Sequence, residues 1–363
     1  MKRIIKSILR KLIEISIEYY VVFLSKTKKK RKGKPKVFYS GAFSGNLGGA
    51  RVKVKRLSEY YKNHLFNFDI VYVLSNFNFL TEKTILNLKS RKIPIILNQN
   101  GVFYSSWYRG DWKKMNKKMS VPYHESDYVF WQSKFCKQSA EYFLGKRKGR
   151  GEILYNAVDT NFFIPQYKKV NRDFTFLITG KIGYELNYRI EISILGLHNA
   201  IKKGLNFRLV IAGDIDRGVK EQNLQLIKEL GIENKVSFLG KYSQKNAVKI
   251  YQMAEAYIMM KYLDPCPNTV IEAMSCGLPV LHSSSGGVPE LVGSDAGVSL
   301  QVIDNYKNNS VTPTKEEVGS GMITLFENYE VLKKNARRRA VVNFDIEKWI
   351  QKHKIIFEKL KNK

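Results

Sequence analysis

The sequence predicts an α/β protein with two doubly wound domains that face each other, each a parallel sheet with helices on both faces. Three observations support this fold class. The chain has 363 residues, more than a single hydrophobic core usually organises. Short apolar runs alternate with helix-like segments through both halves, which is typical of parallel strands joined by right-handed crossovers. A polar stretch at 164–173 separates the halves and is the predicted linker.

The first half contains short apolar runs that we interpret as strands. They cover 36–43, 68–76, 93–101, 127–135 and 151–163. A Gly-rich turn follows the first of them and leads into a helix, and a second helix at 136–145 ends at Gly145. These elements predict an N-terminal domain at 36–168.

The second half repeats the alternation. Its predicted strands cover 174–180, 206–214, 235–242 and 255–262, and its predicted helices cover 187–204, 219–232 and 243–254. Ser243 is the predicted N-cap of the third helix. We assign 169–335 to a C-terminal domain and 336–363 to a helical tail that crosses back to the first domain.

Residues 1–35 form a basic amphipathic segment. Ile5, Ile8, Leu9, Leu12 and Tyr19 recur at helical spacing, and charged residues mark the other side. The two acids Glu14 and Glu18 interrupt the apolar part, so a cleaved signal or a spanning helix is not expected. The pattern favours a helix that lies on an anionic membrane. The alternatives are a solvated leader or a helix packed on the body.

The charge balance is strongly basic, with a formal net charge of +30. Residues 1–36 contain thirteen Lys or Arg against two Glu, and residues 332–363 contain eleven against three acids. Such a surplus favours an anionic partner, which could be membrane lipid, a phosphorylated substrate or nucleic acid. Nucleic acid is the weakest of these, because the chain has no helix-turn-helix, zinc-finger or RNP pattern.

The three Cys and five His show no metal-ligand spacing, and the low Cys count is typical of a reducing compartment. Asp214-Ile215-Asp216 has the letters of a D-x-D motif but follows an apolar strand, so we expect no metal and no cofactor. The predicted location is cytoplasmic, peripheral on the inner face of the membrane.

The stretch 264–290, DPCPNTVIEAMSCGLPVLHSSSGGVPE, concentrates the candidate chemistry. A helix that begins near Asn268, Thr269 and Val270 presents free N–H groups and a positive dipole end, which suit a phosphate. Glu272 lies about one turn further and can reach a hydroxyl such as that of a ribose. Asp264 precedes the helix, where a carboxylate can hold sugar hydroxyls. Together these groups fit a nucleotide sugar, although either acid alone fits an ordinary solvated loop.

This stretch resembles the E-x₇-E signature of the GT-B retaining glycosyltransferases, the glycosyl transferases group 1 family, here in the form D-x₇-E. LVIAGD, VSFLGKYSQKNAVKIYQMAEAYIMMKY, DYVFWQSKFCKQSAEYFLG and ILYNAVDTNFF are similar to the same family, so the resemblance covers roughly 36–345. It implies two Rossmann-like domains facing across a cleft, with the acceptor on the first domain and the donor on the second. It also implies transfer of a hexose with retention and without a metal.

The resemblance implies a role for each matching residue. Glu272 would bind the ribose, Asp264 would contact the donor sugar, and the amides of 268–270 would receive the diphosphate. Lys181, after Gly180, would neutralise the leaving diphosphate. Arg189 is the candidate second cation, with a solvated helix-face Arg as the alternative.

In the first domain, Gly48 and Gly49 would form the family's Gly-Gly turn, with a plain strand-to-helix turn as the alternative. Two departures from the family pattern matter. Asp264 is one methylene shorter than Glu. The family's His near the anomeric carbon is absent, and Asn98, Gln99 and Asn100 occupy that position. Asn98 and Asn100 are the acceptor-side candidates, with a simple turn at Asn100-Gly101 as the alternative.

The predicted function is transfer of a sugar from a nucleotide-diphosphate donor to a glycan or lipid-linked acceptor, as in the synthesis of lipopolysaccharide or another cell-envelope polysaccharide. The departures leave a second hypothesis, a non-catalytic partner subunit of the same fold. A nucleic-acid-binding protein is the third.

Overall fold

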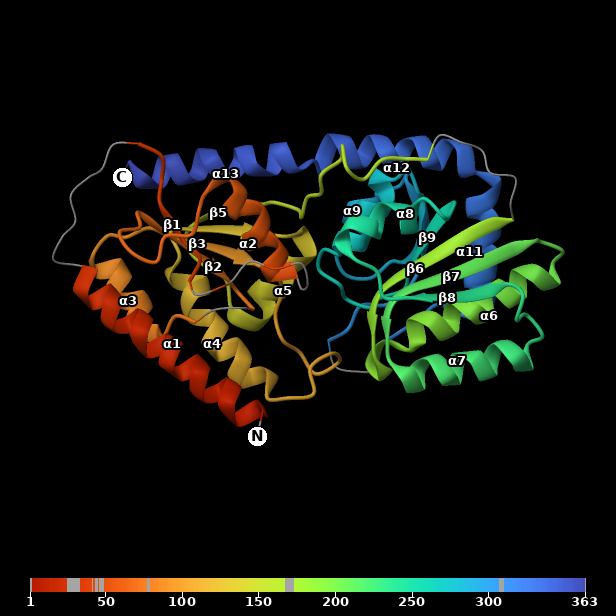
Figure 1. The fold of residues 1–363 in the computed structure, drawn as a ribbon, viewed down its shortest axis with the longest axis horizontal. Helices are drawn as coiled ribbons and strands as arrows, with labels where there is room; N and C mark the ends of the chain where they lie inside the picture. Colours follow the sequence, from red (N-terminus) through yellow and green to blue (C-terminus); the bar gives the residue numbers. More distant parts are fainter. Residues whose placement is uncertain are drawn as a thin grey trace. The chain divides into compact units, whose positions relative to one another are not determined.

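The computed structural model describes residues 2–24, 33–40, 42, 45, 49–76, 79–166, 173–306 and 310–362. The chain divides into two compact units (Figure 1). Unit 1 comprises Met1–Tyr155 and Lys348–Lys363, and unit 2 comprises Asn156–Glu347. Both are α/β units with parallel sheets, so the predicted fold class is confirmed at this level. The predicted linker at 164–173 lies partly outside the described residues.

Unit 1 is built on the parallel sheet β1-β2-β3-β4-β5. Its strands are β1 (Val37–Phe38), β2 (Ile70–Leu74), β3 (Ile95–Gln99), β4 (Tyr128–Trp131) and β5 (Arg150–Ile153). Its helices are α1 (Lys2–Leu24), α2 (Gly49–Tyr60), α3 (Glu82–Ser90), α4 (Trp112–Glu125), α5 (Lys134–Leu144) and α13 (Ile346–Lys361).

The winding of unit 1 reverses at β1. Val37 pairs in parallel with Ile70 of β2 and also forms an isolated bridge with Asn63, which follows α2. A strand residue has two edges, so Asn63 and β2 lie on opposite sides of β1. The connection through α2 therefore runs in the opposite direction along the sheet from the later connections. Since crossovers are right-handed, α2 covers one face of the sheet, and α3, α4 and α5 cover the opposite face. α13 packs on the face of α2, because the Phe357 ring meets the Tyr61 ring at 5.0 Å.

Unit 2 is a six-stranded parallel sheet in the order β11-β10-β9-β6-β7-β8. Its strands are β6 (Phe174–Ile182), β7 (Phe207–Ile215), β8 (Val236–Gly240), β9 (Ala256–Met259), β10 (Val280–Ser283) and β11 (Gly297–Leu300). Its helices are α6 (Tyr188–Lys202), α7 (Arg217–Glu229), α8 (Ala247–Tyr251), α9 (Asn268–Ser275), α10 (Val288–Val292), α11 (Lys315–Glu327) and α12 (Tyr329–Asn343), with 3₁₀ turns at Tyr184–Leu186 and Gln244–Asn246.

The strand order of unit 2 changes direction between β6 and β9. The chain builds outward from β6 through β7 to β8, then returns to place β9 on the other side of β6. In open α/β sheets ligands bind at the carboxyl ends of the strands beside such a switch point. The apolar core that holds this sheet includes Phe176, Ile211 and Ile258, all buried.

Unit 2 begins ahead of the polar stretch in which the linker was predicted. Val158 bridges to Asp345 beyond α12, and its N–H donates to the Phe344 carbonyl at 2.9 Å. The Arg337 guanidinium of α12 donates to the carbonyls of Phe163 at 2.9 Å and Thr160 at 3.0 Å. These contacts attach 156–163 to unit 2.

Two buried histidines make the folded protein sensitive to acid. Desolvation lowers the pKa of His282 in β10 from 6.5 to about 4 and that of His353 in α13 to about 3. The unfolded chain therefore takes up protons first as the pH falls below 6.5, so stability is lost from that pH downward.

We expect the free energy of unfolding to fall by about 3 kcal/mol per histidine between pH 6.5 and about pH 4. Urea titrations across this range measure it. His282→Gln and His353→Gln should each flatten the dependence, because glutamine does not titrate, whereas the more accessible His64→Gln serves as the control. An unchanged slope in both buried variants would contradict the assignment.

Candidate functional site

The candidate donor site lies at the switch point of unit 2. Strand β6 pairs with β9 through Phe176↔Ala256 and Leu177↔Tyr257, so the carboxyl ends of both strands open at the same edge. Gly180 near the end of β6 has φ 141°, a conformation that favours glycine. Lys181 follows it with an exposed side chain. The structure thus brings Lys181 to the same edge as the loop that leaves β9.

The loop from β9 to α9 is fixed by a Gly-Gly turn. The N–H of Gly287 donates to the Asp264 carbonyl at 2.9 Å, and the Leu263 N–H donates to the Ser285 hydroxyl at 2.8 Å. A Cβ added to Gly286, which has φ 67°, would lie 2.6 Å from the Asp264 carbonyl oxygen. Gly286 is therefore required for close approach to the candidate sugar-binding loop.

The Asp264 carboxylate is largely buried and is held on both oxygens. Oδ1 accepts from the Cys266 N–H at 3.1 Å, and Oδ2 forms an ion pair with Lys261 Nζ at 2.7 Å. Its side chain is 12% exposed, so a small part of it reaches solvent. Lys261 was missed in the sequence analysis, although its position three residues before Asp264 is a usable signal.

The N-terminus of α9 has no side-chain cap. Pro267 stands at the N-cap position and makes no capping hydrogen bond, although the Val270 N–H donates to the Pro267 carbonyl at 3.2 Å. The Asn268 side-chain oxygen is buried without a hydrogen-bond partner. Asn268, Thr269 and Val270 are thus the first three residues of the helix, as the sequence predicted. An uncapped first turn leaves a positive dipole end available to an anion.

Glu272 lies in the middle of α9 and is 8% exposed. Its carboxylate accepts a hydrogen bond from the Tyr251 hydroxyl at 2.8 Å. Tyr251 is fully buried, and its hydroxyl lies 3.5 Å from that of Thr179, which is 3.0 Å from the Tyr257 hydroxyl. Burial and the Glu272 charge raise the pKa of Tyr251 far above its ordinary value, so the phenol stays a donor.

Tyr242 belongs to the same hydroxyl network. Burial, with the neighbouring Tyr257 and Glu272, raises its pKa to about 12. Sequence reasoning missed Tyr242, Tyr251 and Tyr257, because aromatic residues usually pack in cores, and it also missed Thr179. The network fixes the rotamer of the Glu272 carboxylate, which is what precise recognition of a hydroxyl requires.

Arg189, the predicted second cation, is a buried side chain in the first turn of α6. It is 4% exposed, and its Nη2 donates to the Thr179 carbonyl at 3.4 Å and to Met259 Sδ at 3.7 Å. Its Nε has no hydrogen-bond partner. A Cβ on Gly180 would lie 3.5 Å from its Nη1. The guanidinium therefore lies under the end of β6 and is not a solvated helix-face group.

The acceptor-side candidates of unit 1 lie at the carboxyl end of β3. The Lys53 ammonium of α2, 3% exposed, donates to the side-chain oxygens of Asn98 at 2.7 Å and Asn100 at 2.6 Å. The Gln132 amide donates to the same Asn100 oxygen. Asn98 and Asn100 therefore belong to a polar cluster around a buried cation, and Asn100 is more than part of a turn. Lys53 was missed, because one Lys in a basic helix gives no signal.

The remaining first-domain candidates are the two glycines. Gly49 is the first residue of α2, whereas Gly48 lies outside the described residues. Gln99 is buried in β3, and its amide donates to the Gly101 carbonyl at 2.6 Å. Their predicted contact with phosphate or acceptor stays a prediction.

Both acids of the D-x-D letters at the end of β7 have structural partners. Asp216 caps α7, accepting from the Gly218 N–H at 3.0 Å, and Asp214 forms an ion pair with Lys241 at 3.0 Å. Among the residues that the structure describes, no group of three or more His, Cys, Asp or Glu is placed to hold a metal ion.

The fold, together with the site at this edge of the sheet, places the chain in the class of GT-B glycosyltransferases. The glycosyl transferases group 1 profile matches residues 159–339. HepE from Anabaena, solved in complex with UDP, superposes with a TM-score of 0.64 at 19% identity over 90% of this chain and 86% of that one. Sucrose-phosphate synthase from Thermosynechococcus elongatus gives 0.61 at 15% identity, over 84% and 76%. The chain belongs to the glycosyl transferases group 1 family.

Most of the alignments with curated relatives cover only part of the relative's sequence. The gpi3 subunit of phosphatidylinositol N-acetylglucosaminyltransferase from Schizosaccharomyces pombe is 23% identical over 63% of this chain and 49% of its own. An uncharacterized glycosyltransferase of Methanocaldococcus jannaschii is 24% identical over 79% of this chain and 80% of its own. The chain spans about half the length of the first curated relatives that it matches.

Proposed function

We propose that this protein transfers a hexose from a nucleotide-diphosphate sugar to a glycan or lipid-linked acceptor. The observation that carries the proposal is the uncapped first turn of α9 between two held carboxylates, Asp264 and Glu272, at the switch point of unit 2. The helix end suits the diphosphate, Glu272 the ribose and Asp264 the sugar. Support for the donor class comes from HepE, which was solved with UDP and with UDP-glucose.

The residues of unit 2 can carry the chemistry without a metal. The nucleoside diphosphate leaves with developing negative charge, and a fixed cation stabilises that charge more in the transition state than in the ground state. Lys181 is exposed at the strand end and Arg189 lies beneath it. We propose metal-independent transfer with retention, in which these two cations and the α9 dipole neutralise the leaving group.

The acceptor is proposed to bind on unit 1, at the polar cluster around Lys53, Asn98 and Asn100. These side chains provide several donors and acceptors at the carboxyl end of β3. We propose that the protein works at the cytoplasmic face of an anionic membrane, in the synthesis of a cell-envelope polysaccharide such as lipopolysaccharide. The part of the chain that the structure describes contains no helix with the length and apolar character needed to span a bilayer.

The alternative is a non-catalytic partner subunit of the same fold. The specific observation that favours it is the Asp264–Lys261 ion pair at 2.7 Å, which occupies the carboxylate that would hold the sugar. Binding of nucleic acid receives no comparable support from the site.

Incubation of the purified protein with a panel of UDP-, GDP- and ADP-sugars tests the proposal. We expect slow release of nucleotide from one donor, because such transferases also hydrolyse the donor when the acceptor is absent. Addition of EDTA should leave the release unchanged. If the protein binds none of the free nucleotides UDP, GDP and ADP by calorimetry, the catalytic proposal fails and the partner-subunit alternative stands.

A further inference from the structure

Helix α1 packs on unit 1 through a side that carries both polar and apolar groups. Glu18 accepts from the Thr81 hydroxyl at 3.2 Å and forms an ion pair with Lys83 at 2.8 Å, both on or beside α3. The Tyr20 hydroxyl accepts from the Asn67 N–H at 2.8 Å, and Val21 is fully buried. Polar contacts therefore fix how the helix is rotated on the body.

This rotation leaves an apolar stripe on the opposite side of α1. The stripe consists of five large side chains spaced three or four residues apart: Ile8, Leu12, Ile15, Tyr19 and Phe23. Their exposed fractions run from 49% for Ile15 to 74% for Tyr19. An amphipathic helix normally buries its apolar face in the core. Here, besides the buried Val21, a row of large apolar side chains points away from the core, and a contiguous stripe of this kind marks an interaction surface.

Unit 1 also carries a lysine cluster at the start of α4. It consists of four exposed residues in the first two turns of α4: Lys113, Lys114, Lys117 and Lys118. Cations at a helix N-terminus oppose the macrodipole, and like charges four residues apart repel. Within the described ranges, none of the four ammonium groups is paired with a carboxylate. The lysine cluster therefore does not stabilise the fold, but it would favour the binding of an anionic partner.

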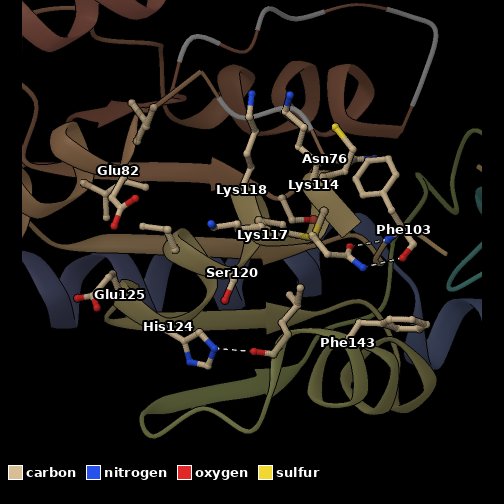
Figure 2. Close-up of a pocket in the computed structure, with 18 of the residues that line it drawn as sticks. Asn76, Glu82, Phe103, Lys114, Lys117, Lys118, Ser120, His124, Glu125 and Phe143 are labelled. Atoms are coloured by element: carbon tan, nitrogen blue, oxygen red, sulfur yellow. Dashed lines mark hydrogen bonds between the residues drawn. The ribbon is translucent and has the colours of Figure 1, made fainter. Parts of the chain in front are cut away.

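The lysine cluster lines a cavity that α1 reaches with Glu14. A cavity of about 990 Å³ is lined by residues of α3 and α4 together with Glu14 of α1. Lys114 and Lys118 extend side by side at its edge (Figure 2). Leu80, Ile85 and Met115 contribute apolar lining beside these ammonium groups. Apolar and cationic groups therefore occur together on this side of unit 1.

We propose that the apolar stripe of α1 and the lysine cluster of α4 form one surface that binds a bilayer rich in anionic lipid. The stripe would enter the acyl boundary, as an interfacial helix does, while the ammonium groups remain at the level of the lipid phosphates. The inference rests on the proposed function, since it places the enzyme where a lipid-linked acceptor resides. In this proposal, the lysines of α4 supply the positive charge that contacts the lipid phosphates.

The charge favours a bilayer over a second copy of this chain. A copy with a formal net charge of +30 would bring its own cluster toward an identical one, and like charges at an interface are unfavourable. An anionic bilayer satisfies the lysines and the stripe together.

Flotation with vesicles tests the surface, using phosphatidylcholine alone and phosphatidylcholine mixed with phosphatidylglycerol. The wild type should float with the mixed vesicles and not with phosphatidylcholine alone. The cluster variant Lys114→Gln/Lys118→Gln should lose about fivefold in partitioning for each lysine. The stripe variants Leu12→Gln/Ile15→Gln and Tyr19→Gln should lose about tenfold or more. All these side chains are exposed, so the fold should persist.

Matched controls come from unit 2. Ile303→Gln/Val331→Gln removes two apolar side chains that are 79% and 64% exposed, and Lys220→Gln/Lys228→Gln removes two exposed lysines of α7. Both should float like the wild type. Absence of flotation in the wild type, or unchanged flotation in the stripe or cluster variants, overturns the proposal. A concentration-dependent dimer in sedimentation velocity that the stripe variants abolish, without vesicle binding, assigns the stripe to a second copy.

The same variants separate this inference from the proposed function. Nucleotide release from a soluble donor does not require the membrane, so the stripe and cluster variants should retain it. Loss of vesicle binding with retained release would leave the transferase intact, whereas a wild type that floats but never binds nucleotide would refute only the proposed function.

Discussion

Replacing Glu272 with Gln is expected to lower kcat/KM for nucleotide release by about 100-fold, because the proposed ribose contact and the Tyr251 hydrogen bond both lose a charged acceptor in a buried site. The carboxylate is 8% exposed and already fixed by Tyr251, so little rearrangement can restore the contact. Steady-state release from the donor identified in the panel measures the change, and calorimetry with the free nucleotide reports whether affinity falls in parallel.

Two variants make the Glu272 result specific. Tyr251→Phe retains the carboxylate and removes the hydrogen bond that holds it, so its loss should be smaller, about tenfold. Glu327→Gln alters an exposed carboxylate of α11 and should behave like the wild type. Nucleotide binding that is equal in the wild type and Glu272→Gln would refute the assigned ribose contact.

Replacing Lys181 with Ala is expected to lower kcat for nucleotide release by about 100- to 1000-fold while the KM for the donor changes little. The reason is that the ammonium meets charge that develops only as the diphosphate leaves. The side chain is exposed at the end of β6, so the variant should unfold at the same temperature as the wild type.

The comparison that isolates charge at this position is Lys181→Arg, which should recover part of kcat. Lys245→Ala removes another exposed lysine of unit 2 and should leave both constants unchanged. A fall in donor affinity with unchanged kcat would mean that Lys181 binds the ground state, and would contradict its role in leaving-group departure.

Local patterns of the second half were sufficient to predict its elements. The strand at 206–214 corresponds to β7, Phe207–Ile215, and the helix at 187–204 to α6, Tyr188–Lys202. Buried parallel strands are continuous apolar runs and their helices end at Gly or polar caps, so each boundary is encoded within a few residues. The start of α9 at Asn268 was equally readable, because Pro is tolerated at or just before the first turn.

Elements that depend on distant contacts were less accessible. Of the described residues in the predicted strand at 36–43, Val37–Phe38 form the strand β1. The unit boundary falls at Tyr155/Asn156, because 156–163 pack against α12, nearly two hundred residues away. Composition marks a polar loop but does not show which neighbours a segment contacts.

The sequence by itself determined the fold class, the family and the helix start within the stretch 264–272. Periodicity, turn residues and motif order are local properties of the chain. Only the tertiary structure decided that Arg189 is buried under β6, that Tyr251 holds Glu272, and that Lys53 lies between Asn98 and Asn100. It also decided which side of α1 faces outward. The physical reason is that burial and hydrogen bonding join residues far apart in the chain, and their spacing in the sequence carries no record of that contact.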